Sequence, residues 1–295
     1  MRHFIPPLVV LCSALLAPGA AQGQSVLDWP VLLEARPSAL VVGAGAVLVN
    51  PANAGDLAGR AEALVSDLET PDAMGLRALT IAAALNVTGG WTLGVGYRHM
   101  AVGDMLLTDG PPVAGGTAEL PTLDVAEDVY AVAVSFRTGA LGFGMAARLD
   151  TPADALGNEE AWAGTVGASW TPRVPVVGLR LAGLMELDDD APDIGGAVEL
   201  EAPPVLDQRL RLGLGYGTRS ATDLGREHLV VGTGTWRGVA ELQAGASAQP
   251  GTDGTDWVPM LAGLVRIGRY RLGIVREHLP NGFGAAMHYR LSVAF

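Results

Sequence analysis

The chain ends in Met287-His288-Tyr289-Arg290-Leu291-Ser292-Val293-Ala294-Phe295, a stretch that alternates between two kinds of side chain. The odd-numbered positions are all apolar or aromatic, and the even-numbered positions are small, polar or charged. A β-strand sends successive side chains to opposite faces. The stretch therefore predicts a strand with one apolar face and one polar face.

The same ending resembles the C-terminal signal of bacterial outer-membrane β-barrels, which the barrel assembly machinery reads. The residues that carry this candidate assembly signal are Tyr289, Leu291, Val293 and Phe295. We therefore predict that the whole chain forms a transmembrane barrel. The alternative on this stretch alone is the edge strand of a soluble sheet.

The composition favours a membrane barrel over a soluble enzyme. The chain has 295 residues, of which 49% are hydrophobic and 40 are glycine, and helical periodicity is scarce. After the N-terminus, no run reaches the roughly 20 apolar residues that cross a bilayer as a helix. The net charge of −12 argues against a nucleic-acid partner. An exported, apolar chain with few helices can cross a membrane only as a closed barrel.

The first 23 residues have the pattern of a secretory signal peptide, with a short basic start, an apolar core from Leu8 to Leu16 and small residues after it. We therefore expect Sec-type export to the bacterial outer membrane, with residues 1–23 removed. Cys12 lies inside the apolar core, so the mature chain would contain no cysteine and no disulfide.

Between residue 59 and the C-terminus the sequence shows a repeating rhythm of alternating stretches about ten residues long, the length of tilted transmembrane strands. We predict an all-β, up-and-down antiparallel barrel of about fourteen strands over residues 59–295. The predicted strands are 59–68, 76–87, 91–102, 124–137, 140–150, 160–172, 175–187, 194–202, 207–218, 227–236, 238–248, 256–267, 269–278 and 285–295.

The connections between these strands alternate between short and long. Tight hairpins are predicted at 88–90, 138–139, 237 and 268, whereas connections such as 103–123 and 151–159 are longer and polar. Membrane barrels have short periplasmic turns and longer outer loops. A soluble sandwich has no reason to keep this alternation, so it favours the barrel with both termini in the periplasm.

Energy predicts which face of each strand points into the lumen. An arginine on the lipid face near the bilayer midplane costs roughly 2–4 kcal/mol, so the charged parity should face inward. The predicted lumen-facing charges are Arg98, Arg148, Arg180, Arg211, Arg271, Arg290, Glu186, Glu199 and Glu241. They could be salt bridges that fill a narrow barrel, or a polar path that tunes what passes.

Residues 24–58 do not alternate, and we predict a plug-like segment in the lumen or near the periplasmic mouth. The alternative is one more strand from Leu40 to Val49. Gly43 and Gly45 are followed by Asn50-Pro51-Ala52, and Asn-Pro favours a turn. Small residues here could lie against wall glycines such as Gly94 and Gly144.

Fourteen strands after such a segment resemble the FadL-like long-chain fatty acid transporter superfamily, including its PorV-like relatives. In that family the N-terminal segment plugs the barrel and carries glycines followed by an Asn-Pro-Ala motif. The resemblance implies that Gly43, Gly45, Asn50, Pro51 and Ala52 form a plug motif, and that the cargo is a hydrophobic small molecule. The chain lacks the family's acidic stretch between these motifs and is much shorter than the fatty acid transporters.

Other residue clusters suggest little chemistry. Asp188-Asp189-Asp190 could hold Ca²⁺ but lacks EF-hand spacing, so a solvated acidic loop is the simpler interpretation. No nucleophile elbow or P-loop occurs. We expect no enzyme activity, no metal and no cofactor, and outer-membrane lipid and the assembly machinery as partners. Two functions stay open: a transport barrel, or a secretion accessory or structural barrel; an outer-membrane enzyme is a third hypothesis.

Overall fold

The computed structural model describes residues 36–71, 75–106, 122–152, 161–172, 177–187, 193–205, 208–218, 226–236, 238–251, 254–278 and 284–295. The expected signal peptide, Cys12 and Asp188-Asp189-Asp190 lie outside the described residues. The segment before the strands contains three short 3-10 helices, η3 (Ser38–Leu40), η4 (Gly43–Leu48) and η5 (Pro51–Asn53).

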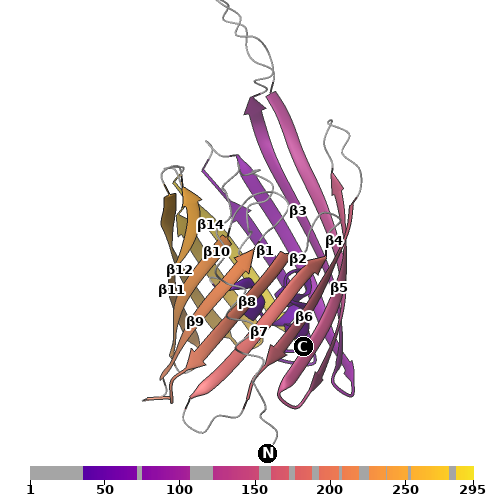
Figure 1. The fold of residues 1–295 in the computed structure, drawn as a ribbon, viewed down its shortest axis with the longest axis vertical. Helices are drawn as coiled ribbons and strands as arrows, with labels where there is room; N and C mark the ends of the chain where they lie inside the picture. Colours follow the sequence, from indigo (N-terminus) through magenta and orange to yellow (C-terminus); the bar gives the residue numbers. More distant parts are fainter. Residues whose placement is uncertain are drawn as a thin grey trace, which may run out of the picture.

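The strands that follow form one closed antiparallel barrel, which confirms the predicted fold class (Figure 1). They are β1 (Ala61–Glu69), β2 (Leu76–Thr88), β3 (Trp91–Leu106), β4 (Thr122–Thr138), β5 (Leu141–Pro152), β6 (Ala161–Trp170), β7 (Gly178–Leu187), β8 (Asp193–Glu201), β9 (Gln208–Thr218), β10 (Arg226–Trp236), β11 (Ala240–Gly251), β12 (Gly254–Ile267), β13 (Tyr270–His278) and β14 (Ala285–Ala294). Each predicted strand is present, with bounds shifted by a few residues. β3 and β4 are longer than predicted and reach beyond the ends of their neighbours (Figure 1).

The barrel closes between β1 and β14 through an unbroken ladder, from Glu62 opposite Ala294 to Glu69 opposite Met287. The carbonyl oxygen of Phe295 extends this seam, because it accepts hydrogen bonds from the backbone N–H groups of Arg60 at 2.7 Å and Ala61 at 3.2 Å. Over its described residues the seam is fully paired and shows no lateral gap.

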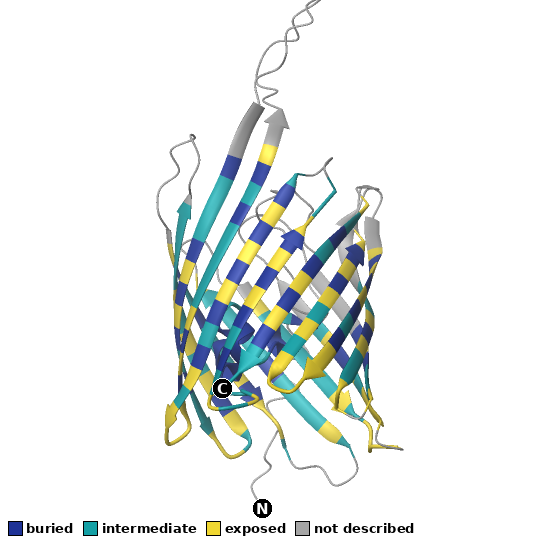
Figure 2. Cartoon of the chain, turned by 180° about the vertical axis from the view of Figure 1, so that it is seen from behind, coloured by how far each residue is buried: buried dark blue, intermediate teal, exposed yellow. Residues whose placement is uncertain are grey.

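The outer surface carries most of the exposed large apolar side chains, and buried and exposed positions alternate along the strands (Figure 2). Trp91, Trp162, Trp170 and Trp257 lie on this surface near strand ends. Several hairpins turn on glycines with positive φ, including Gly89, Gly139, Gly238 and Gly268. No helix among the described residues has the length and hydropathy needed to cross a bilayer.

The alternative of an additional strand over 40–49 is wrong, because these residues form η3 and η4. The physical reason lies in the closed barrel. β1 and β14 pair with each other, so no sheet edge is left for a further strand. The short 3-10 turns instead satisfy local backbone groups, as in the hydrogen bond from Leu40 N to Pro37 O at 2.8 Å.

Candidate functional site in the barrel lumen

Residues 36–58, here called the luminal segment, lie inside the barrel and pack on one side of its wall. The substantial contacts of η3, η4 and η5 with strands are all with β1–β8. Val41, Ala44, Ala46 and Val47 form a buried cluster with inward-facing side chains of β1, β2 and β4 such as Leu64. The segment therefore shares one hydrophobic core with the wall, which fixes its position.

Glycines in the wall allow this close approach. A Cβ on Gly144 would lie 2.3 Å from the carbonyl carbon of Pro51, and one on Gly94 would lie 2.3 Å from Val47 Cγ2. On Gly167 it would lie 2.0 Å from Asn50 Oδ1. Any larger residue at these positions would force the luminal segment away from the wall.

The Asn-Pro-Ala motif supplies the internal hydrogen bonds of the segment. Asn50 and Asn53 both donate through Nδ2 to the carbonyl oxygen of Ala39, each at 2.7 Å. Asn50 Oδ1 also accepts from Ala52 N at 3.3 Å at the start of η5, where Pro51 occupies the first helical turn. The two asparagines are fully buried, so these bonds tie η5 to η3 in a dry environment.

The glycines of the motif have a different role. Gly43 has φ +72°, and a Cβ on it would lie 2.6 Å from Oε2 of Glu62 on β1. Gly45 is buried within η4. The structure thus places all five predicted motif residues inside the lumen, in contact with the wall or with one another; their role as a plug remains a proposal.

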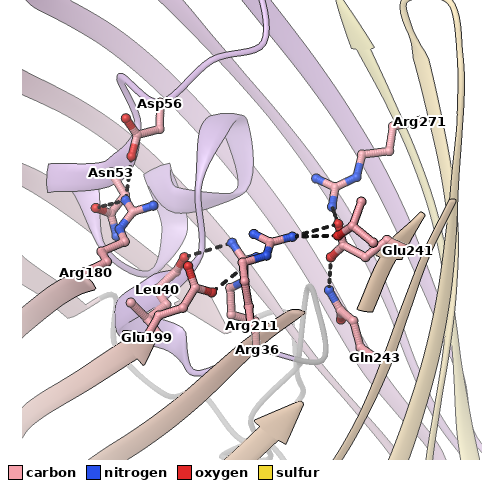
Figure 3. Close-up of polar contacts among 11 residues, drawn as sticks. Arg36, Leu40, Asn53, Asp56, Arg180, Glu199, Arg211, Glu241, Gln243 and Arg271 are labelled. Carbon is pink, nitrogen blue, oxygen red and sulfur yellow. Dashed lines mark hydrogen bonds and ion pairs between the residues drawn. The ribbon is translucent and has the colours of Figure 1, made fainter. Parts of the chain in front are cut away.

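Ion pairs attach the luminal segment to the wall near both of its ends (Figure 3). Asp56 pairs with Arg137 of β4 and with Arg180 of β7, and the Arg180 Nη2–Asp56 Oδ2 distance is 2.5 Å. Arg180 Nη2 also donates to Asn53 Oδ1 at 2.6 Å. At the start of the segment, Arg36 Nη2 lies 3.6 Å from Glu199 Oε2 of β8.

Arg36, Asp56 and Arg137 were not among the predicted lumen charges. A signal existed for Arg137, since it shares the inward parity of Ser135 and Ala133 in β4, both buried. No sequence signal identified Arg36 or Asp56, because they belong to a segment without periodicity. Their partners Glu199 and Arg180 are more than a hundred positions away along the chain.

The remaining predicted charges form separate groups on the wall. Arg148 pairs with Glu186 of β7 and with Asp150 at 2.9 Å. On the far side of the lumen, Glu241 of β11 lies 3.1 Å from Arg211 and 3.5 Å from Arg271, and Gln243 donates to it at 2.5 Å (Figure 3).

Arg98 on β3 and Arg290 on β14 lie at inward positions, and Arg290 is 4% exposed. Arg290 is directly opposite Ser66 of β1, which is opposite Thr80 of β2, and Thr80 is opposite Arg98. The structure therefore places the predicted charges in several groups along the lumen wall.

A cavity of about 630 Å³ opens where the luminal segment leaves part of the lumen unfilled. We call it the mouth pocket, because the turn between β12 and β13, the start of β1 and the end of β14 surround it. Its lining residues are Val42, Asp56, Leu57, Ala58, Gly59, Glu62, Arg266, Gly268, Arg269, Arg271, Ser292, Ala294 and Phe295. It therefore lies between the luminal segment and β12–β14.

Two further parts of the lumen wall are apolar. One cluster contains Leu68, Leu76, Ala78, Met100, Val102 and Ala286, from β1, β2, β3 and β14. The other contains Val231, Met260, Ala262, Leu264 and Val275, from β10, β12 and β13. These residues have the inward parity of their strands, and each is 5% exposed or less, so they are packed against other atoms on the inner side of the wall.

A buried polar pair separates the two apolar clusters. His288 Nε2 of β14 lies 3.7 Å from Glu277 Oε2 of β13, and each side chain is 1% exposed. Glu277 is directly opposite Met260 and Ala286, which belong to the two clusters. The described residues contain no group of three or more metal-ligating side chains.

A polar group also lies on the outward parity of β3 and β4. Asp128 Oδ1 accepts from the Tyr97 hydroxyl at 2.7 Å and lies 2.8 Å from His99 Nδ1. The rings of Tyr97 and Tyr130 have centroids 5.2 Å apart. Above the apolar positions Leu93 and Val95 this group marks the transition from an apolar to a polar outer surface.

Comparison with known proteins gives likeness in fold only. No model of a protein family matches the sequence, and no curated protein matches it. Among solved structures, a mutant of the TodX monoaromatic hydrocarbon channel aligns with a TM-score of 0.50 and 9% identity, over 85% of this chain and 92% of that one.

Two other solved structures align less well. A mutant Rh. blastica porin aligns at TM-score 0.46 and 11% identity, over 80% of this chain and 98% of that one. CdiB from Acinetobacter baumannii aligns at TM-score 0.46 and 11% identity, over 80% of this chain and 60% of that one. At these identities the similarity concerns the closed-barrel fold, and the function has to be argued from the lumen itself.

Proposed function

We propose that the protein is an outer-membrane channel for small apolar molecules, and that the luminal segment is its plug. The observation that carries the proposal is the pair of apolar clusters on the lumen wall, which include Leu68, Met100, Met260 and Val275. The interior of a water-filled porin is polar. A wall that presents aliphatic and thioether side chains instead favours a cargo that is itself apolar.

The membrane location is part of the same proposal. Outward-facing apolar side chains such as Val95, Met145 and Leu212 are 57%, 58% and 44% exposed, which would be costly to leave in water over a whole surface. The hydrocarbon of a lipid bilayer would cover these apolar side chains and remove that cost. In this proposal the C-terminal residues Tyr289, Leu291, Val293 and Phe295 are the signal for the assembly machinery, and the chain reaches the outer membrane after Sec-type export.

The route past the plug would follow the side of the lumen that the luminal segment does not cover. The 3-10 helices of the segment contact β1–β8, Pro37 also approaches Gly215 of β9, and the mouth pocket lies between the segment and β12–β14. A molecule that displaces the side chains packed on the apolar clusters would thus reach the mouth pocket without complete unfolding of the segment. A small displacement of the plug, held by Asp56 and Arg36, would widen this route.

The test compares uptake of an apolar and a polar probe of similar size. Cells of a Gram-negative host that lacks its own porins, and that make the full chain, are given radiolabelled toluene or radiolabelled arabinose. We expect faster toluene uptake and unchanged arabinose uptake relative to cells with an empty vector. Arabinose uptake equal to that of toluene would indicate a general diffusion porin and contradict the proposal.

A barrel without transport is the second candidate, and the ion pairs of the plug favour it. Asp56 binds arginines from two strands, and Arg36 reaches a third strand, so ion pairs fasten the luminal segment firmly to the wall on which it packs. This arrangement would suit a secretion accessory or structural barrel. If neither probe enters faster, and single channels stay closed in planar bilayers, this second function is supported.

A further inference from the structure

Unlike charges flank the outer face of β14, the strand whose end the C-terminus marks in Figure 2. Arg276 is an exposed outward residue of β13, and Asp67 is an exposed outward residue of β1. Arg276 is directly opposite Met287 of β14, and Asp67 is directly opposite Tyr289 of β14. A basic side chain therefore lies on one side of this strand and an acidic side chain on the other.

The two charges lie at the same height on the barrel. Arg276 is six residues from Tyr270, where β13 begins, and Asp67 is six residues from Ala61, where β1 begins. Tyr289 is six residues from Phe295, which forms backbone hydrogen bonds with Ala61 at that end of the barrel. Arg276, Tyr289 and Asp67 thus occupy equivalent levels on three neighbouring strands.

Other strands are apolar at this level of the outer surface. Leu261 of β12 is directly opposite Arg276 and is 56% exposed. Val132 of β4 is six residues from the end of its strand at Thr138 and is 59% exposed. Arg276 and Asp67 therefore lie within the band that lipid would cover, where a charge without a partner costs free energy.

Neither of these charges is paired inside the chain. Among the residues that the structure describes, Arg276 and Asp67 have no ion-pair or hydrogen-bond partner. The residues opposite them on the neighbouring strands are all uncharged: Met287, Leu261, Tyr289 and Leu79. Both charges are thus available to a partner outside the barrel.

The next outward position on each flank repeats this distribution. On β1 it is Glu69, and on β13 it is His278, whose imidazole can donate a hydrogen bond to a carboxylate. Glu69 differs from Asp67, because it is directly opposite Arg77 of β2 and so has a basic neighbour in its own chain. The acidic flank and the basic flank therefore extend over two levels of the barrel.

We propose that this face binds a second copy of the same chain, related by a two-fold axis that runs along the barrel direction past Tyr289. In a two-fold interface, each contact occurs twice, with the two residues exchanged between the copies. The rotation exchanges the flanks of β14, so Arg276 of each copy would lie against Asp67 of the other. Equal height and opposite charge are what such an axis requires of the two positions.

A second copy matches this face better than lipid does. A lipid headgroup of one sign would match either Arg276 or Asp67 and repel the other. Lipid tails are as apolar as Leu291 and Leu272, so apolar contact alone would not hold two barrels together. Unlike charges attract strongly in these surroundings, because the dielectric constant is low. The dimer rests on the membrane location proposed above and does not depend on transport.

The test is disulfide cross-linking of the full chain in the outer membrane of a Gram-negative host. Cys12→Ser removes the single cysteine of the sequence, and Tyr289→Cys then places one thiol beside the proposed axis. The matched control is Val132→Cys, which places a thiol at the same height on the lipid-facing surface of β4. After oxidation with copper phenanthroline we expect a covalent dimer for Tyr289→Cys and only background for Val132→Cys.

Charge reversal tests the contact itself in the Tyr289→Cys background. Arg276→Glu should lower the yield of covalent dimer about tenfold or more, because like charges placed together across an interface oppose association. Asp67→Arg should have the same effect. The two reversals combined restore unlike charges and should restore the yield, which a general requirement for either side chain in folding would not do.

Heat-modifiable migration on a gel reports the closed barrel for each variant. If Tyr289→Cys does not fold, Met287→Cys, at the next outward position of β14, replaces it with a bismaleimide as the cross-linker. A folded barrel that gives no more dimer than Val132→Cys would mean that lipid or another protein covers this face, and would overturn the proposal. An unchanged yield in folded Arg276→Glu would also overturn it. A native chain without heat-modifiable migration would instead contradict the membrane barrel, and the dimer with it.

Discussion

The two sides of the lumen, both made from alternating strands, are filled in different ways. On β1–β8 the wall glycines come so close to the luminal segment that a Cβ on Gly144 would lie 2.4 Å from Ala52 N. On β13, a Cβ on Gly273 would meet only side-chain atoms, Leu264 Cδ2 at 3.2 Å and, further away, Arg290 Cβ at 3.7 Å. The first side, here called the packed side, holds the segment; β10–β14, the far side, borders the mouth pocket with charged and apolar side chains.

The difference shows how a barrel can hold a plug and still leave room beside it. Strand alternation fixes which positions face inward, and it allows these positions to carry either small or long side chains. Where inward positions are small, the backbone of a second segment can pack at van der Waals distance. Where inward positions are long and charged, such as Arg211, Glu241 and Arg271, a second backbone is kept away and a cavity remains. Each of the following predictions changes a residue on one of the two sides and compares the effect with that of a control substitution or with the expected size of the effect.

Gly144→Ala should have the largest effect, because the added methyl group would overlap the backbone of Pro51 and Ala52. Overpacking of this kind costs about 2–3 kcal/mol. We expect the luminal segment to leave the wall while the barrel stays closed. The measurement is protease cleavage within residues 36–58 of a barrel that keeps its heat-modifiable migration.

Gly273→Ala is the matched control on the far side, where the neighbouring Leu264 side chain can move. It should leave the luminal segment protected. Equal cleavage in both variants would mean that the packed side is no more constrained than the far side.

Asp56→Asn should have the second largest effect, because it removes the partner of both Arg137 and Arg180. Arg137 is 35% exposed, so the loss is smaller than for a fully buried pair, at about 1–2 kcal/mol. We expect more frequent channel openings in planar bilayers. Asp150→Asn is the control, since Asp150 pairs with Arg148 within the wall; a similar rise in openings there would argue against a role of Asp56 in holding the plug.

Asn53→Ala should loosen the luminal segment without releasing it. It removes the hydrogen bond to the Ala39 carbonyl and the acceptor for Arg180, which together contribute about 1–2 kcal/mol. Hydrogen exchange at the amide of Leu40 should become faster. Asn86→Ala, which breaks a hydrogen bond to Thr92 within the wall, should leave the exchange at Leu40 unchanged.

Glu241→Gln should have the smallest effect on stability, at about 1 kcal/mol or less, because it lies on the far side and does not touch the luminal segment. It leaves Arg211 and Arg271 without their shared carboxylate. We therefore expect the midpoint of thermal unfolding to fall by about 2–4 °C, measured by the loss of heat-modifiable migration. A fall as large as that of Asp56→Asn would contradict the small contribution expected of this group.

Much of the barrel was predictable from the sequence, because a strand in a closed sheet has simple local rules. Side chains alternate, so the charged parity of β5 and β9 identified Arg148 and Arg211 as inward-facing. Turn glycines such as Gly139 and Gly268 marked the short hairpins. The luminal segment could not be predicted in this detail, because 3-10 turns carry no periodic signal and its contacts come from strands distant in sequence.

The sequence by itself determined the strand number, the inward and outward faces and the short turns, since each depends on neighbouring residues. Only the tertiary structure decided that Asp56 meets Arg137 and Arg180, that Glu277 lies beside His288, and that Arg266 faces Arg271 over a pocket. These contacts join residues from different strands, or from the segment and the wall. Their distances depend on the register around the closed barrel and on where the luminal segment packs, which no local pattern encodes.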